Sequence, residues 1–419
     1  MLIEYGSVFI TLAVVLGLYM TWGIGANDVA NAMGTSVGSG AISIKQAIII
    51  AAIFEFSGAF IAGGNVTKTI RKGIIDPTPI LGNPEILVWG MLSSLLAAAL
   101  WLTVASWMGW PVSTTHSIIG AIVGFAMVGI GVDAVNWSKI GTIVISWVVS
   151  PMVGGTFSFL IMRSIQRFIL DTDRPFRNAQ RYAPLYIFFV GFLISLVTLF
   201  KGLKHLEIEL NIPQSFLVAL AFGSIIALIG RFLIDRLRMK EAESVHDQFA
   251  QIEKIFGVMM LFTACAMAFA HGSNDVANGI GPMAAVVSVV QSGGEMAQKS
   301  ALPLWILVVG GCGIILGLAT FGYRVIQTIG TKITELVPTR GFSAELAAAA
   351  TVVLASRTGI PVSTTHIAVG AVVGVGLARG IGALDLRVIG GIFMSWVITL
   401  PVGALLSIFF FFFFRGVFL

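Results

Sequence analysis

An internal duplication constrains the fold of this chain more than any other feature. The segment Gly25–Ala32, which reads Gly-Ala-Asn-Asp-Val-Ala-Asn-Ala, returns 247 residues later as Gly272–Gly279, Gly-Ser-Asn-Asp-Val-Ala-Asn-Gly. The segment Pro111–His116, Pro-Val-Ser-Thr-Thr-His, returns unchanged 250 residues later as Pro361–His366. Two motifs repeated in the same order at nearly the same offset indicate two copies of one structural unit.

The composition places this duplicated unit in a membrane. Of 419 residues, 57% are hydrophobic and only 11% are charged, and the mean hydropathy is +0.96. A soluble domain of this size does not reach these values. The apolar runs are long and continuous, which favours helices over a barrel of short alternating strands. We therefore predict an all-α polytopic membrane protein with roughly ten to twelve transmembrane segments, some of them short or interrupted. The net charge of +5 comes from lysines and arginines at the ends of apolar spans, which argues against a nucleic-acid partner.

The positions of the basic residues predict how the units are oriented. We expect a first repeat at 1–169, a linking region at 170–252 with two transmembrane helices and short basic loops, and a second repeat at 253–419. Basic residues cluster at Arg163–Arg181 and at Arg231–Lys254. Because cytoplasmic loops carry an excess of lysine and arginine, both clusters are predicted to be cytoplasmic and the N-terminus to lie outside the cell membrane. The two repeats then have opposite orientations, as in secondary transporters.

The aspartate of the first motif predicts a transport site. A carboxylate within an apolar run is costly, so one kept twice at matching places marks a pathway. In inverted-repeat transporters, broken helices from both repeats meet near the bilayer midplane. We therefore expect a helix break at each aspartate motif, with freed carbonyls, carboxylates and amide oxygens forming a cage that hard cations prefer. The predicted cation ligands are Asn27, Asp28, Asn31, Asn274, Asp275 and Asn278.

The second motif predicts a helix that starts inside the membrane. Proline is favoured in the first helical turn, and the free amides of that turn carry the positive end of the helix dipole. Hydroxyls in the same turn can donate to an oxyanion, although an N-capping cluster in a tight interface is the alternative. The predicted anion-binding residues are Ser113, Thr114, Thr115, Ser363, Thr364 and Thr365, together with Asn27, Asn274, Asp28 and Asp275.

The absence of lysine and arginine from both motifs restricts the substrate. Burying an anion without a neutralising charge costs on the order of 20 kcal/mol by the idealised Born estimate, and still several after relaxation. Two aspartates nearby add to this cost. Cations that bind with the anion, or protons that the anion donates to the carboxylates, lower it. Dihydrogen phosphate has such protons and sulfate at neutral pH has none, so the residues favour phosphate.

With these motifs, the chain resembles the inorganic phosphate transporter family, the sodium- or proton-coupled PiT carriers grouped with the type III sodium-phosphate cotransporters. The resemblance covers both halves and extends to Phe54–Gly58, Thr69–Ile75 and Gly341–Glu345. It implies that the aspartates, the adjoining asparagines and the Ser/Thr clusters handle phosphate and its coupling cation. It also adds Glu55 and Glu345 to the expected sodium ligands. No cofactor is expected besides sodium as the coupling ion, and a homodimer is allowed but not required.

Sodium-coupled phosphate symport by alternating access is thus the predicted function, and three alternatives stay open. The first is proton coupling, with His116 and His366 either shuttling protons or only packing. The second is a sulfate carrier on the same plan. The third is an intramembrane aspartyl protease, which would use two aspartates as a dyad but has no use for the other repeated residues. His271 is given no part in coupling, because its counterpart in the first repeat is Ile24. Arg357, whose counterpart is Trp107, is expected to have a structural role.

Overall fold

The computed structural model describes residues 2, 4–62, 73–76, 78–80, 82–201, 210–237, 245–294, 303–326, 333–357 and 361–419. Within these ranges the chain is helical, and its only β-type pairing is an isolated antiparallel bridge between Ile75 and Val135. The helices are α1 (Gly6–Gly38), α2 (Ile44–Ala62), η1 (Thr78–Ile80), α4 (Pro84–Met108), α5 (Thr114–Gly129), η2 (Val132–Ala134), α6 (Trp137–Ile165), η3 (Gln166–Leu170), α7 (Pro175–Lys201), α8 (Ile212–Asp235), α9 (Val245–Gln291), α10 (Leu304–Phe321), α12 (Pro338–Arg357), α13 (Thr364–Arg379), η5 (Ile381–Ala383) and α14 (Leu386–Phe418).

The helix lengths match a membrane-spanning bundle. A helix needs about 20 apolar residues to cross the hydrocarbon core. In the described part of the chain, nine helices are long and apolar enough to cross, and two apolar helices, α5 and α13, are shorter, at 16 residues each. The predicted all-α polytopic class, with some short segments, is confirmed.

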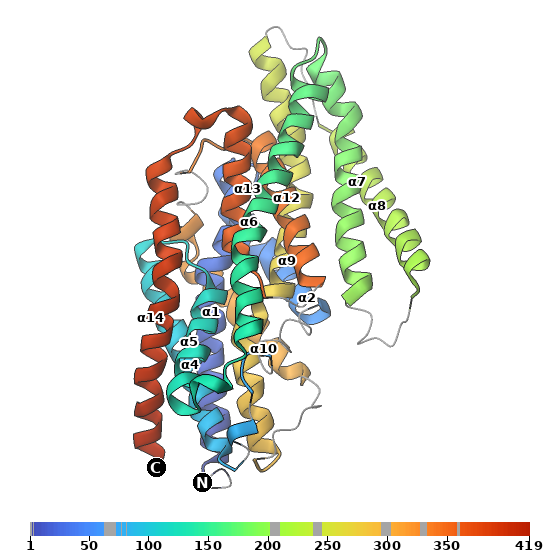
Figure 1. Cartoon of the computed structure of the whole chain (residues 1–419). Helices are drawn as coiled ribbons and strands as arrows, with labels where there is room; N and C mark the ends of the chain where they lie inside the picture. The colour runs from blue at the N-terminus through green and yellow to red at the C-terminus, as the bar shows by residue number, and fades with distance from the viewer. Residues whose placement is uncertain are drawn as a thin grey trace.

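The two halves of the chain run in opposite directions. In Figure 1, α1 rises from the N-terminus at the bottom, whereas α9 starts at the top and descends. In the same way α6 rises and α14 descends to the C-terminus at the bottom. The short helices are inverted in the same way, because α5 lies in the lower part of the bundle and α13 in the upper part. The fold is therefore built from inverted repeats, as the basic residues predicted.

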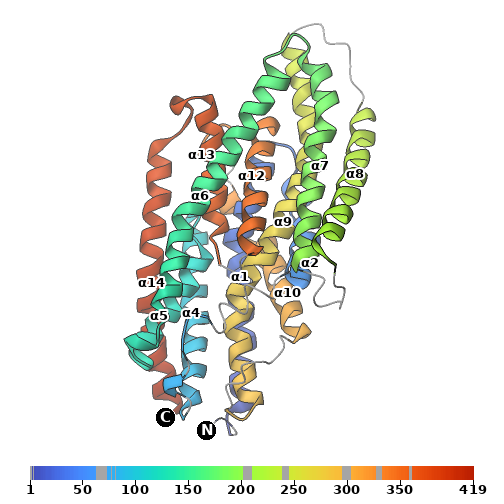
Figure 2. The ribbon, with the colours of Figure 1, turned by 45° about the vertical axis from the view of Figure 1, so that its right-hand side comes forward.

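Two helices stand apart from the repeats. Helices α7 and α8 form a hairpin at the edge of the bundle, where α7 packs on α9 (Figures 1 and 2). Many apolar side chains of α8 are exposed, among them Leu217 and Leu228, because this helix has a neighbour on one side only. Its start is fixed by a capping box between Asn211 and Gln214. The hairpin occupies the segment predicted to link the repeats.

The half-helices pack against the opposite repeat. Helix α5 of the first repeat lies on α14, and α13 of the second lies on α6. At these crossings a Cβ on Gly120 would lie 2.6 Å from the carbonyl oxygen of Leu400, and one on Gly370 would lie 2.4 Å from that of Pro151. Glycine permits this approach, which stabilises helix pairs in lipid. Each repeat therefore holds the short helix of the other.

The helices that carry the aspartates are fixed by close backbone crossings. A Cβ on Gly25 of α1 would lie 1.9 Å from the carbonyl oxygen of Ile314 on α10. A Cβ on Gly272 of α9 would lie 2.1 Å from that of Glu55 on α2. Because each glycine precedes its aspartate by three residues, the crossings set the depth at which the two carboxylates lie.

The predicted helix break at the aspartate motifs is wrong. Helix α1 is continuous from Gly6 to Gly38, and α9 from Val245 to Gln291. The chain leaves the helical path at the hydroxyl motifs, before α5 and α13. There α4 ends on Gly109 in the left-handed conformation, with φ of 69°, and Pro111 follows, which cannot continue a helix. Asn27 and Asn274 do not break α1 and α9, and the amides of both donate to carbonyl groups of other segments.

Two substitutions on α9 test the role of the close crossing. Gly272→Leu would drive a side chain into backbone that cannot move aside, and overpacking of this kind costs more than ~3 kcal/mol when nothing can yield. Gly257→Leu, on the same helix, would enter open space and should be neutral. We expect Gly272→Leu to give no monodisperse peak on size-exclusion chromatography. Gly257→Leu should have the yield and thermal stability of the unaltered protein. Equal behaviour of the two variants would contradict the close contact between Gly272 and the backbone of Glu55.

Candidate functional site

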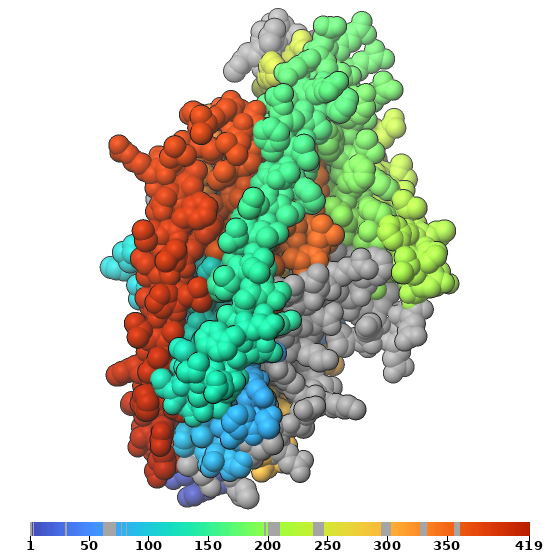
Figure 3. Space-filling model, in the orientation of Figure 1, coloured from blue at the N-terminus to red at the C-terminus, as the bar shows by residue number. Residues whose placement is uncertain are grey.

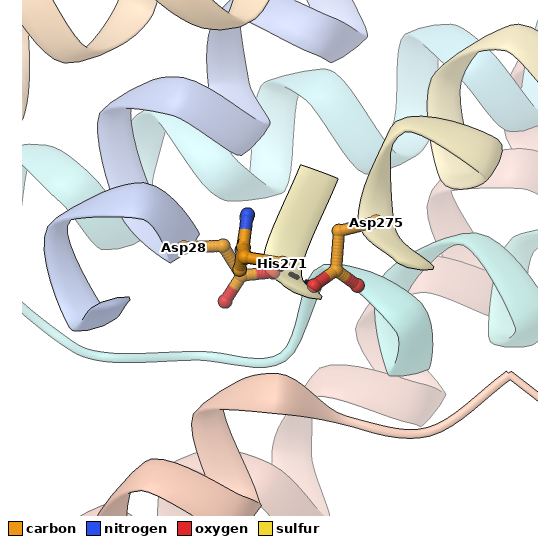
Figure 4. Close-up of side chains that lie close together, drawn as sticks. All are labelled: Asp28, His271 and Asp275. Atoms are coloured by element: carbon orange, nitrogen blue, oxygen red, sulfur yellow. Dashed lines mark ion pairs between the residues drawn. The ribbon is translucent and has the colours of Figure 1, made fainter. Parts of the chain in front are cut away.

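The two repeated aspartates meet in the middle of the bundle. Asp28 on α1 and Asp275 on α9 are both buried, at 1% and 0% exposure. His271, one turn before Asp275, lies between them (Figure 4). Each of these three residues offers one ligand atom, and the three atoms lie within 4.8 Å of one another. The two motif copies, 247 residues apart in sequence, therefore form one site.

Threonine hydroxyls tie both carboxylates to the beginnings of the half-helices. Each aspartate accepts one hydrogen bond from a threonine of its own repeat and one from a threonine of the other repeat. The donors are Thr114 and Thr365 to Asp28, and Thr364 at 2.6 Å and Thr115 at 3.3 Å to Asp275. This exchange of threonine donors between the repeats follows their pseudo-two-fold symmetry. All four motifs thus converge on a single pair of carboxylates.

Serine caps explain why the half-helices begin where they do. Ser113 is the N-cap of α5 and Ser363 the N-cap of α13, and each side chain accepts a hydrogen bond from a backbone N–H, that of His116 or His366, at 3.2 Å. The predicted helix starts are confirmed. The prolines, however, precede the caps and lie outside the first turn. The capping alternative therefore holds for the serines, and their part in binding an anion stays a prediction.

The first asparagine of each motif holds the non-helical stretch beside the site. The Asn27 amide donates to the carbonyl of Trp110 at 2.9 Å and accepts from the N–H of Val112 at 3.1 Å. The Asn274 amide donates to the carbonyl of Val362 at 2.9 Å. These bonds compensate backbone groups that no helix satisfies. The two asparagines position the half-helices, and ligation of a cation by them stays a prediction.

The second asparagine of the second motif lies inside the site. The Asn278 amide nitrogen lies 3.1 Å from the hydroxyls of Thr114 and Thr115 and 3.1 Å from the carboxylate of Asp275. Its amide oxygen is buried and has no hydrogen-bond partner in the described structure. That oxygen is suited to a hard cation. The equivalent side chain of Asn31 lies outside the described part of the structure.

His271, which has no counterpart in the first repeat, lies beside the two aspartates. Its Nδ1 lies 2.8 Å from Oε2 of Glu55, and its Nε2 lies 3.1 Å from Oδ2 of Asp275, an ion-pair distance without an aligned hydrogen bond. All three side chains are buried. Residues four apart share one helix face, so the spacing alone places His271 beside Asp275. The duplication does not indicate His271, because Ile24 stands in its place in the first repeat.

The second predicted glutamate belongs to a separate polar cluster. Glu345 on α12 accepts hydrogen bonds from Thr35 at 2.6 Å, from Ser36 at 2.5 Å and from Thr263 at 2.7 Å. A small cavity of about 10 Å³ adjoins its carboxylate. Glu55 and Glu345 are therefore not equivalent, because the first pairs with a histidine beside the aspartates and the second lies among hydroxyls.

The motif histidines face a different part of the bundle. The rings of His116 and His366 lie 4.3 Å apart, centroid to centroid. His116 packs on Trp147 at 3.7 Å and His366 stacks on Trp396 at 3.5 Å. Their described contacts are with aromatic rings and backbone and not with the aspartates. This geometry favours the packing alternative over a proton shuttle.

Comparisons with known proteins agree with one another. The sequence matches the model of the phosphate transporter family over residues 24–407. It is 50% identical, over 99% of both chains, to a protein of Haemophilus influenzae named as a phosphate permease. It is 43% identical to the chloroplastic inorganic phosphate transporter 2-1 of Arabidopsis thaliana, over 94% of this chain and 70% of that one. The solved structure of a sodium-dependent phosphate transporter is similar with a TM-score of 0.90 and 39% identity, over 98% of this chain and 99% of that one.

The hydrogen bonds from the threonines to the aspartates can be tested without a transport assay. Thr364→Val keeps the side-chain shape but removes the hydroxyl from Oδ2 of the buried Asp275, and should lower the free energy of unfolding by about 1–3 kcal/mol. Thr364→Ser keeps a hydroxyl and should retain most of the free energy of unfolding. The control is Thr142→Val, since Thr142 is exposed on α6 and bonds only to its own helix. Equal stability of the two valine variants in detergent would show that the hydroxyl contributes nothing.

Proposed function

Because the chain belongs to the phosphate transporter family, we propose that it is a sodium-coupled symporter that moves inorganic phosphate across the cytoplasmic membrane by alternating access. The observation that carries the proposal is the exchange of threonine donors between two buried aspartates of inverted repeats. The family and the relatives are transporters and permeases and not enzymes, which removes the protease alternative. The solved structure it resembles is that of a sodium-dependent transporter, which supports sodium as the coupling ion.

Sodium is required in this proposal because a threonine hydroxyl cannot serve a carboxylate and a phosphate at once. A hydroxyl has a single proton to donate. In the described structure, Thr114, Thr364 and Thr365 donate that proton to an aspartate. The hydroxyl of Thr115 lies within hydrogen-bond distance of both Asp275, at 3.3 Å, and the carbonyl of Val362, at 3.2 Å. A sodium ion on the carboxylates replaces these donors as the compensating partner and leaves the hydroxyls free to donate to phosphate. Phosphate then binds tightly only after sodium.

The phosphate is proposed to lie between the N-termini of α5 and α13. The first amides of a helix have no partner within the helix and carry roughly half a positive charge. The four threonine hydroxyls lie in the same turns, and Ser113 and Ser363 cap them. Dihydrogen phosphate can also donate its own protons to Asp28 or Asp275. Sulfate cannot, so the site discriminates between the two anions by a hydrogen-bond donor.

The sodium ligands are proposed to be oxygens around the aspartates. Hard cations prefer carboxylate and amide oxygens. The carboxylates of Asp28 and Asp275 and the unpartnered amide oxygen of Asn278 meet this requirement. Glu345, with the hydroxyls around it, is proposed as part of a second cation site. Asn27 and Asn274 are proposed to position these oxygens through their hydrogen bonds to the non-helical stretches, and Asn31 stays a predicted ligand.

Proton-coupled phosphate transport is the second candidate, and one contact favours it. His271 touches both Glu55 and Asp275, so a protonatable ring joins two carboxylates inside the bundle. Such a chain can carry a proton instead of a sodium ion. In either case the inverted halves are proposed to rock against each other about the shared site. The basic ends of α6 and α7, at the top in Figure 1, are proposed to face the cytoplasm, with the N-terminus outside.

Uptake of radiolabelled phosphate into proteoliposomes tests the coupling ion. At fixed pH, an inward sodium gradient is compared with an equal potassium gradient, and excess sulfate is added as competitor. We expect uptake that requires sodium and ignores sulfate. Uptake that ignores sodium but follows an imposed pH gradient would move the coupling to protons and to the Glu55–His271–Asp275 chain. Phosphate that binds equally well with and without sodium would contradict the hydroxyl argument.

Neutralising either aspartate should stop transport while the protein still folds. Asp28→Asn and Asp275→Asn each remove the charge that holds sodium, and a loss of ~2.7 kcal/mol in cation affinity lowers uptake roughly 100-fold at limiting sodium. The control is Asp385→Asn, because Asp385 is the N-cap of α14 and asparagine caps equally well. Normal uptake by both site variants would remove the aspartates from the mechanism.

A further inference from the structure

An apolar groove on the outer face of the bundle ends on buried polar rings. The groove has a volume of about 890 Å³ and lies between α6, α13 and α14. Figure 3 shows α6 and α14 running over this face. Its walls include the exposed side chains of Val148, Met152, Phe393 and Val397. The volume falls within the ~300–1,000 Å³ of typical small-molecule sites.

The floor of the groove consists of two histidines and two tryptophans. His116, His366, Trp147 and Trp396 all line the groove and are all at most 7% exposed. Nevertheless, both ring nitrogens of His116, Nε2 of His366 and Nε1 of both tryptophans have no hydrogen-bond partner in the described structure. Buried polar atoms are nearly always hydrogen-bonded, so five unpartnered ones in one place require an explanation. A ligand with a polar end would supply the missing partners.

The arrangement of donors and acceptors selects the polar group. His366 Nδ1 lies 3.2 Å from the carbonyl oxygen of Trp147, which can only accept, so Nδ1 carries the proton. Nε2 of the neutral ring is then an acceptor, whereas both indole N–H groups are donors. The floor therefore presents acceptors and donors side by side. An uncharged carboxyl group matches both, because it has an O–H donor and a carbonyl acceptor, whereas an ester has no donor.

The depth of the floor in the membrane selects the rest of the ligand. Trp147 is about ten residues from the start of α6, and Trp396 about ten from the start of α14. At ~1.5 Å per residue this is ~15 Å, half of a ~30 Å hydrocarbon core. Since α6 and α14 run in opposite directions, both estimates lead to the midplane. A charged phospholipid head group is too costly to place there, whereas an uncharged carboxyl group can lie there when its O–H and carbonyl are hydrogen-bonded.

We propose that the groove binds a long-chain fatty acid in its uncharged form. The carboxyl group lies on the His–Trp floor, and the chain lies along the apolar walls of α6 and α14. His116 and His366 directly follow Thr115 and Thr365, so the bound acid touches both half-helices one residue away from the aspartate site. This inference does not depend on the coupling ion or the substrate, because binding is measured without transport.

Photolabelling of the protein in nanodiscs tests the site. The probe is palmitic acid carrying a diazirine on its chain, and labelled peptides are identified by mass spectrometry. We expect labels on groove residues of α6, α13 and α14, with competition by unlabelled palmitic acid and at least about tenfold weaker competition by methyl palmitate, which lacks the O–H donor. Equal competition by the ester would show a cavity for acyl chains alone. Labels spread evenly over the lipid-facing helices, α8 included, would overturn the proposal.

Matched tryptophan variants test the floor. Trp147→Phe with Trp396→Phe removes both indole donors but keeps aromatic rings on the histidines, and should weaken labelling about fivefold or more. Trp305→Phe on α10, outside the groove, is the control and should label as the unaltered protein does. Unchanged labelling of the double variant would show that the carboxyl group does not bind at the His–Trp floor. If the double variant does not fold, the comparison of acid with ester on the unaltered protein decides.

Discussion

Two carboxylates buried in the middle of a membrane bundle need partners, and the organisation of the rest of the molecule follows from supplying them. Lipid offers no hydrogen bonds, so each partner must come from the protein. A continuous helix cannot present several first-turn hydroxyls at mid-depth, whereas a helix that begins there can. The half-helices α5 and α13 provide such beginnings, and they bring threonines from both repeats to each aspartate. The short helices are therefore a consequence of the buried charge.

The inverted arrangement makes this exchange possible. Because α5 packs on α14 and α13 on α6, each repeat supports the half-helix of the other. Glycines at the crossings bring the backbones close, and the same is true where Gly25 and Gly272 meet the neighbouring helices. The site is thus held by contacts between the halves rather than within one half. A relative movement of the halves would change the bonds to both aspartates together.

The symmetry is broken beside the aspartates, and the break is chemically meaningful. Glu55 and His271 form a buried pair next to Asp275, whereas the position that corresponds to His271 in the first repeat is Ile24. At the α2–α9 crossing, Gly272 meets the backbone of Glu55. At the corresponding α1–α10 crossing, Gly25 meets the backbone of Ile314, a residue without charge. The symmetric part of the site suits a single anion on the pseudo-two-fold axis. The asymmetric part adds one titratable histidine to the site, because the first repeat has Ile24 in place of His271.

Sequence patterns alone predict the membrane class, the two inverted halves, the start of the half-helices and the four motifs that meet. These follow from composition, from the side on which basic residues lie and from repetition, all of which are properties of the chain that do not depend on contacts. The positions at which the helical path breaks depend instead on contacts between distant segments. Asn27 and Asn274 resemble helix breakers in the sequence, but their amides bond to distant segments and leave α1 and α9 intact. Only the tertiary structure placed His271, because its partner Glu55 is 216 residues away and no local pattern encodes that contact.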